Sequence, residues 1–171
     1  MIRTARLVLR PARASDLDDL HAVFSDPRAM QYWDSPPYQD RDQTRALLAG
    51  MIAADPTRSC DFVVEYQGRA RGKAGCWRLG EVGFILHPDI WGQGLAYEAL
   101  GAALPAAFAR LPMAAITADV DPRNAASLRV LAKLGFVETG RAARTIKVGD
   151  VWCDSVYLAL DRPPDIPAPR M

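Results

Sequence analysis

The stretch that most constrains the fold is HPDIWGQGLAYEAL, residues 87–100, which joins a strand-like run to an alanine-rich run. The preceding residues, EVGFIL, carry β-branched and aromatic side chains that favour a strand. The alanine and leucine residues after Gly94 favour a helix. Glycines at such a junction permit left-handed backbone and a close approach by another group. The segment therefore predicts a strand, a bare turn at Gly92-Gln93-Gly94, and a helix from about Gly94 to Arg110.

Several interpretations of this turn compete at the level of the local sequence. A P-loop needs a lysine and a hydroxyl residue directly after its last glycine, and Gly94 is followed by neither. A dinucleotide fingerprint fits Gly92 and Gly94 but meets Tyr97 where a small residue is required. An acyl-CoA loop needs a glycine in its fourth place and a small residue in its sixth, which Gly94 and Ala96 supply, with Trp91 in first place. A structural turn that binds nothing also fits.

The rest of the chain alternates between strand and helix patterns and predicts an α/β (α+β) fold. Strands are expected at 5–10, 60–68, 69–80, 81–87, 114–121, 136–145 and 151–161, and helices at 15–24, 40–54, 94–110 and 124–134. Gly68 and Gly80 separate three of these strands into an antiparallel meander, and the last two form a hairpin around Gly149-Asp150. Helix 94–110 makes its flanking strands parallel. The result is a mixed, mostly antiparallel seven-stranded sheet with about four helices.

Single residues predict where the helices begin, bend and end. Ser15 and Asp18 have the spacing of a capping box at the start of the first helix. Asn124 is a suitable N-cap for the last helix, and Gly135 follows its end. Pro105 removes a backbone hydrogen bond inside the third helix at a cost of ~3 kcal/mol, which predicts a kink or an early end there.

Length, charge and cysteine usage narrow the class of protein. The 171 residues fit one domain, at 1–162, followed by a flexible proline-rich tail at 163–171. The net charge of +1 gives no basic surface for nucleic acid, and no run approaches the ~20 apolar residues that cross a membrane. We therefore expect a cytoplasmic protein that binds neither nucleic acid nor a membrane. Three scattered cysteines and two distant histidines favour reduced, buried thiols over a disulfide framework or a metal site.

Four segments, in this order, resemble the GCN5-related N-acetyltransferases (GNAT). They lie within residues 4–162 and read TARLVLRPARASDLDDLHAVFSDPRAMQYW, EVGFILHPDIWGQGLAYEAL, NAASLRVLAKLGF and VWCDSVYLALDR. They look most similar to the branch that acetylates ribosomal-protein N-termini and its relatives, in which Trp91 fits the head of the loop. Four matches in order are more specific than one glycine turn, and they favour the acyl-CoA interpretation.

The resemblance implies a GNAT fold and an enzyme that moves an acetyl group from acetyl-CoA to a primary amine in a ternary complex. The acceptor would be a small molecule or a protein N-terminus, and no metal would take part. A homodimer is compatible with the family. The alternative function is a non-catalytic acyl-CoA-binding or sensing module, because the same cradle would serve without a productive acceptor site.

The resemblance also implies which residues hold the donor. The backbone of Phe84, Ile85 and Leu86 would pair with the pantetheine arm, and one N–H near Ile85 or Leu86 would polarise the thioester carbonyl. The pyrophosphate would lie on the N–H groups of Gly92, Gln93, Gly94, Leu95, Ala96 and Tyr97, helped by the helix dipole. Asn124 would contact the pantetheine, and Ser127 would protonate or hydrogen-bond the departing thiolate. Helix capping alone also explains Asn124 and Ser127.

The acceptor side is less specified. Glu81 is the best-placed carboxylate to take the ammonium proton through a chain of water, although a surface charge at a strand end also explains it. The resemblance implies an acceptor pocket lined by Trp33, Tyr38, Trp77 and Trp152. Aromatic residues at these positions could equally pack in the core.

Overall fold

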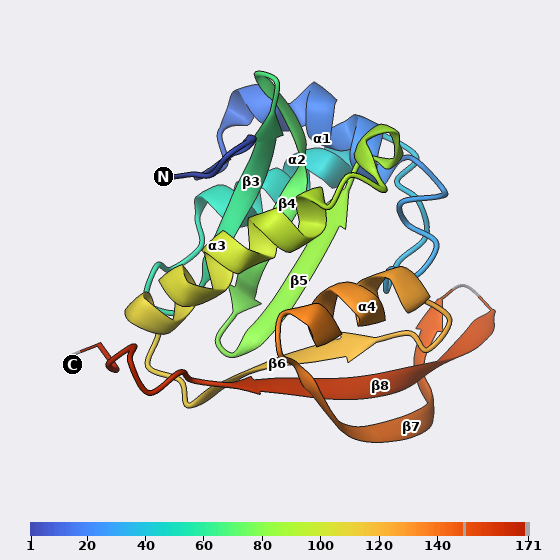
Figure 1. Ribbon diagram of the computed structural model, residues 1–171. Coiled ribbons are helices and arrows are strands. Elements are labelled where there is room, and N and C mark those ends of the chain that lie inside the picture. Colours follow the sequence, from blue (N-terminus) through green and yellow to red (C-terminus); the bar gives the residue numbers. More distant parts are fainter. Residues whose placement is uncertain (149, 170–171) are drawn as a thin grey trace.

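One eight-stranded sheet forms the centre of the molecule, and helices cover both of its faces (Figure 1). The computed structural model describes residues 1–148 and 150–169. The strands are β1 (Ile2–Arg3), β2 (Leu7–Arg10), β3 (Cys60–Tyr66), β4 (Arg69–Arg78), β5 (Glu81–Leu86), β6 (Ala115–Val120), β7 (Val137–Val148) and β8 (Val151–Asp161). The helices are α1 (Leu17–Phe24), α2 (Arg41–Ile52), α3 (Leu95–Arg110) and α4 (Ala125–Lys133). The strand order is β1-β2-β3-β4-β5-β6-β8-β7.

The strand pairing confirms the predicted mixed sheet. Within the described chain, β5 and β6 are parallel and the other neighbouring strands are antiparallel. The sheet has eight strands instead of seven, because Ile2–Arg3 pairs with β2. Two residues are too few to show an alternating pattern, so β1 has no signal of its own. The closing hairpin also forms, with Val148 opposite Val151, while Gly149 lies outside the described residues.

The predicted cap of the first helix is wrong. Ser15 lies inside a short 3₁₀ turn, Ala14–Asp16, that precedes α1. The carboxylate that accepts a hydrogen bond there belongs to Asp16, from the backbone N–H of Arg13 at 2.9 Å. Asp18 is exposed and pairs with Arg41 on α2 instead. Asp16 occupies the N-cap position of α1 without a side-chain cap hydrogen bond, and its buried carboxylate instead binds back to Arg13 before the turn.

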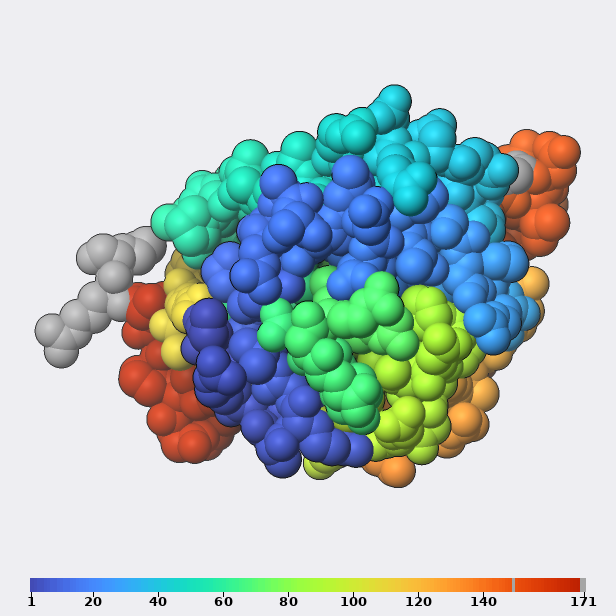
Figure 2. Space-filling view, turned by 90° about the horizontal axis from the view of Figure 1, so that it is seen from above, coloured from blue at the N-terminus to red at the C-terminus, as the bar shows by residue number. Residues whose placement is uncertain are grey.

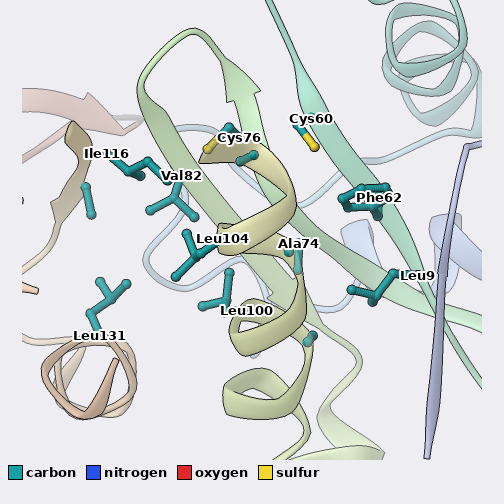
Figure 3. Packing of buried hydrophobic residues seen from close by; sticks show 14 of the residues in the cluster. Leu9, Cys60, Phe62, Ala74, Cys76, Val82, Leu100, Leu104, Ile116 and Leu131 are labelled. Carbon is teal, nitrogen blue, oxygen red and sulfur yellow. The ribbon is translucent and has the colours of Figure 1, made fainter. Parts of the chain in front are cut away.

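Two apolar clusters hold the helices to the sheet, one on each face. The larger cluster lies under α3 and α4, where Leu100 and Leu104 of α3 pack beside Val82 and Cys76 of the sheet (Figure 3). The smaller cluster joins α1 and α2 to the opposite face through Leu20, Val23, Phe24, Leu48, Val63 and Ile85. In the view from above in Figure 2, the segment of α1 appears in blue and that of α2 in cyan. Strand β5 thus contributes to both clusters.

Helix α3 continues through Pro105, so the early end predicted there is wrong. Pro105 and Gly101, whose carbonyl the proline leaves without a helical partner, are both exposed. Water can reach such a carbonyl on the solvent side of a helix. Gly101 also has no side chain to crowd the proline ring. The proline is therefore tolerated because it lies on the outer face of the helix.

The end of α3 is held by a residue from the far end of the chain. Arg162, directly after β8, donates to the backbone carbonyls of Phe108 (2.5 Å), Leu111 (2.8 Å) and Met113 (2.7 Å). Ile166 packs against the larger apolar cluster. The flexibility expected for residues 163–171 stays a prediction.

We expect Arg162→Ala to lower the free energy of unfolding by about 2–3 kcal/mol, because it leaves part-buried carbonyls at the end of α3 without charged donors. Urea titration followed by circular dichroism measures this loss. The control is Arg141→Ala, whose guanidinium contacts the exposed Glu138. Equal stability of the two variants would contradict an anchoring role for Arg162.

Candidate functional site

The parallel strands β5 and β6 part directly after they meet. Their register contains one described pair, Glu81 opposite Thr117, and the Thr117 N–H donates to the Gly80 carbonyl at 2.7 Å. From this shared start the two strands run apart (Figure 1). Within residues 1–148 and 150–169, the backbone of β5 beyond Val82 therefore has no paired strand on the β6 side.

The pairing of β5 with β4 tells which backbone groups face this side. The His87 N–H donates to the Arg71 carbonyl of β4 at 2.8 Å. Because backbone groups alternate between the two sides of an antiparallel strand, Ile85 also faces β4. Phe84 and Leu86 then face β6. Of the three strand residues predicted to hold the donor, Phe84 and Leu86 thus turn their N–H and C=O groups toward the β6 side of β5.

The glycine turn that follows β5 has left-handed backbone at both glycines. The φ angles of Gly92 and Gly94 are 73° and 74°. A Cβ built on Gly92 would have no atom within 4 Å, and one on Gly94 would meet only the guanidinium of Arg6 at 3.8 Å. Gly94 is the N-cap of α3 and offers no side chain to the first N–H groups of the helix. The turn therefore combines open space with helix N–H groups that lack a side-chain cap, a combination suited to a bound phosphate.

Two contacts around this turn were not predicted from sequence. The indole Nε1 of Trp91 donates to the Leu86 carbonyl at 2.8 Å, so the side chain folds back on β5. Arg6 donates to the Gln93 carbonyl at 2.8 Å and binds Glu98 in the first turn of α3. Arg6 lies 87 residues before Gln93, and no local pattern signals such a contact.

The start of α4 lies at the end of β6. Asn124 caps the helix, as expected, and accepts a hydrogen bond from the Ser127 N–H at 3.1 Å. This contact occupies the side-chain oxygen of Asn124 and leaves its amide nitrogen as a donor. Arg123 is anchored by Asp121 at 2.9 Å, and hydrogen bonds from Arg123 lower the pKa of that carboxyl. Both Asn124 and Ser127 are half-buried.

Glu81 lies where β5 and β6 meet, next to a predicted acceptor residue. Its carboxylate forms an ion pair with Arg78, whose Nε lies 2.8 Å away. The Arg78 guanidinium also lies over the ring of Trp77, 4.4 Å from its centre. Trp77 reaches the position above Gly83, where an added Cβ would be 3.3 Å from the ring. The structure thus brings Glu81 and Trp77 together through Arg78.

The other three predicted acceptor residues belong to two elements, the α1–α2 loop and the β7–β8 hairpin. Trp33 and Tyr38 belong to the loop between α1 and α2, and both rings pack on Phe24, with ring centres 5.9 and 5.4 Å away. Burial raises the pKa of Tyr38, and the charge of Asp34 adds to this. Trp152 lies near the tip of the β7–β8 hairpin, 46% exposed. The loop pair therefore has a packing role, and the grouping of all four aromatics stays a prediction.

Neither membrane-crossing helices nor metal clusters occur in the part of the chain that is described. None of the helices in 1–148 and 150–169 combines the length and apolar character that a membrane crossing requires. Among the same residues, no three His, Cys, Asp or Glu side chains gather closely enough to hold a metal ion. The thiols of Cys60 and Cys76 are buried and free, and burial raises the pKa of Cys76 to about 12.

Comparison with known proteins gives a consistent result. Residues 6–137, more than half of the chain, match the family model described as the acetyltransferase (GNAT) domain. The spermidine N(1)-acetyltransferase of Escherichia coli K12 is 30% identical over 161 residues, which cover 89% of this chain and 84% of the relative.

Solved structures agree with these matches. A GNAT-family acetyltransferase from Bacillus anthracis superposes with a TM-score of 0.81 at 26% identity, over 94% of this chain and 97% of that one. The ribosomal L7/L12 alpha-N-protein acetyltransferase RimL, in complex with coenzyme A, gives 0.78 at 19% identity, over 92% and 95%. These likenesses confirm the expected fold.

Proposed function

This chain belongs to the GNAT acetyltransferase family and is an acetyl-CoA-dependent N-acetyltransferase, and we propose that it acetylates a primary amine by direct attack in a ternary complex. The observation that carries the proposal is the parting of β5 and β6 beside an open glycine turn. An acyl-CoA needs both features, because its pantetheine arm is an amide chain and its pyrophosphate an anion. We also place the chain near the branch that acetylates ribosomal-protein N-termini, to which RimL belongs by its name.

The donor would bind along β5 and end at α3. The outward N–H groups of Phe84 and Leu86 and the C=O of Phe84 would pair with the pantetheine amides like an added strand, while the Leu86 C=O already accepts from Trp91. The N–H groups from Gly92 to Tyr97 would receive the pyrophosphate, because the helix start is uncapped and carries the positive end of the dipole. A backbone N–H of β5 would then donate to the thioester oxygen as negative charge develops there.

Transfer also needs a group that stabilises the negative charge on the leaving sulfur. Ser127 lies in the first turn of α4, and its N–H is already fixed by Asn124. Its hydroxyl is the proposed donor to the departing thiolate. The amine must lose a proton, and Glu81 would accept it through water if a base is used. The ion pair with Arg78 competes with that task.

The acceptor class follows from how much help the amine needs. A protein N-terminus has a pKa of ~7.7–8.0 and is at least about half neutral at pH 8, whereas an alkyl amine near ~10.4 needs a base. The two named relatives act on spermidine and on a protein α-amine. Thiol release from acetyl-CoA, measured with spermidine and with short peptides at several pH values, tests the acceptor. CoA binding without amine-dependent thiol release would instead support a non-catalytic binding module.

We expect Ser127→Ala to lower kcat by about 10- to 100-fold while CoA affinity changes less than twofold, because the hydroxyl acts on the leaving group and not on the bound donor. Steady-state kinetics and calorimetric CoA titration measure the two quantities. Ser25→Ala, which loses a hydroxyl bonded to the His21 carbonyl of α1, is the control. An unchanged kcat would remove Ser127 from the mechanism.

A further inference from the structure

One guanidinium ties the glycine turn to both the helix behind it and the N-terminal segment. Arg6 donates from Nη1 to the Gln93 carbonyl at 2.8 Å and from Nε to the Glu98 carboxylate at 2.7 Å. Its Nη2 lies 2.6 Å from the same carboxylate. The Arg6 backbone N–H (2.8 Å) and the Thr4 hydroxyl (2.5 Å) also bind Glu98. The N-terminal segment thus meets both the glycine turn and the first turn of α3 at this one side chain.

The contact with Gln93 fixes the direction of the next N–H group. A trans peptide is planar, and its carbonyl points opposite to the N–H of the following residue. The described chain contains no cis peptide. Holding the Gln93 carbonyl against Arg6 therefore points the Gly94 N–H away from the guanidinium. Without this contact, the Gln93-Gly94 peptide could rotate, because the glycine on its C-terminal side permits many backbone angles.

Arg6 acts on the carboxylate of Glu98 as well as on the glycine turn. Glu98 lies in the first turn of α3, where its charge would repel an anion at the helix start. Burial by itself would raise the pKa of Glu98, but hydrogen bonds from Thr4 and Arg6 outweigh it and lower the pKa. The carboxylate therefore stays ionised and is neutralised locally by Arg6. The pair presents an ordered, nearly neutral support beside the turn.

We propose that Arg6 is a positioning residue for the donor, which holds the Gln93-Gly94 peptide in the orientation that a pyrophosphate requires. The inference rests on the proposed function of the glycine turn. It assigns to Arg6 no contact with the reacting atoms. The loss of this residue should therefore weaken donor binding and leave the chemical step intact.

The test compares Arg6→Ala with the wild-type enzyme in CoA calorimetry and acetyl-CoA kinetics. We expect Kd for CoA and KM for acetyl-CoA to rise about tenfold, because an unfixed peptide must be ordered when the donor binds. The kcat should stay within about twofold, since the thioester end of the donor is distant from Arg6. Dephospho-CoA should lose affinity by the same factor, because the turn is proposed to bind the pyrophosphate and not the 3′-phosphate.

Two further variants separate positioning from general stability. Arg6→Lys keeps a positive charge beside Glu98 but cannot bind Glu98 Oε2 through two nitrogens and the Gln93 carbonyl through a third in one plane. It should melt close to the wild type and still bind CoA about threefold more weakly. Arg28→Ala is the matched control, because Arg28 is exposed and pairs with Asp26. Its CoA affinity should not change.

The outcomes are distinct. Unchanged Kd in a folded Arg6→Ala, or in Arg6→Lys if the alanine variant does not fold, would overturn the positioning role. A loss confined to CoA and absent with dephospho-CoA would also overturn it, since it would mean a direct contact with the 3′-phosphate. Failure of the wild-type protein to bind CoA would instead remove the proposed function on which this inference rests.

Discussion

Replacing Gly92 with valine is expected to weaken CoA binding about 100-fold, equivalent to about 2.7 kcal/mol, while the protein still folds. Gly92 has a φ of 73°, and an added Cβ would meet no protein atom within 4 Å. The cost to folding is therefore the strain of a left-handed valine, about 1–2 kcal/mol. The same open space is where we propose that the pyrophosphate binds, so the branched side chain would exclude it. Calorimetric CoA titration and thermal melting measure the two effects.

The chain offers a closely matched control for this substitution. Gly68, in the turn between β3 and β4, has a φ of 77° and equally open space around the missing Cβ. Gly68→Val should therefore lose the same stability but keep full CoA affinity. Full CoA affinity in both variants would rule out the glycine turn as the pyrophosphate site. Equal loss in both would assign the effect to general destabilisation.

Most of the fold could be predicted from sequence because its signals are local. The alternating side chains of EVGFIL and the alanine-rich run after Gly94 define β5 and α3 within a residue or two. Asn124 and Gly135 mark the ends of α4 through their own backbone chemistry. The prediction failed at the start of the first helix. Ser15 lies inside a 3₁₀ turn, and the buried carboxylate there is that of Asp16, which binds Arg10.

The candidate site divides in the same way. Gly92 and Gly94 could be singled out because glycine itself carries the signal for left-handed backbone. The side of β5 that Phe84 and Leu86 face depends on the hydrogen-bond register with β4, which the predicted antiparallel meander leaves open. The contact between Arg6 and Glu98 joins an N-terminal segment to a helix 92 residues later. Such a pair becomes visible only when the fold brings the two segments together.

Asp16→Ala is expected to lower the free energy of unfolding by about 3–5 kcal/mol, the cost of removing one partner from a buried ion pair. Arg10 and Asp16 are 5% and 4% exposed, with two hydrogen bonds of 2.7 and 2.8 Å between them. Glu65 also binds Arg10, at 2.6 Å. Without Asp16 the buried guanidinium keeps one carboxylate instead of two. Asp18→Ala, which removes a side chain that is 79% exposed, should cost less than about 1 kcal/mol.

The pH dependence of this difference identifies its cause as charge. Burial alone would raise the pKa of Asp16, but hydrogen bonds from Arg10 and from the Arg13 backbone outweigh it, so the pKa lies below its ordinary value. A carboxyl with a lowered pKa stabilises the fold above its unfolded pKa of ~3.9, and this stability is lost as the pH falls through the folded value. The gap between wild type and Asp16→Ala should therefore be constant near neutral pH and shrink below about pH 4. Urea unfolding at stepped pH measures it. A gap that persists undiminished in acid would mean that packing of the side chain, and not its charge, joins the 3₁₀ turn to β2.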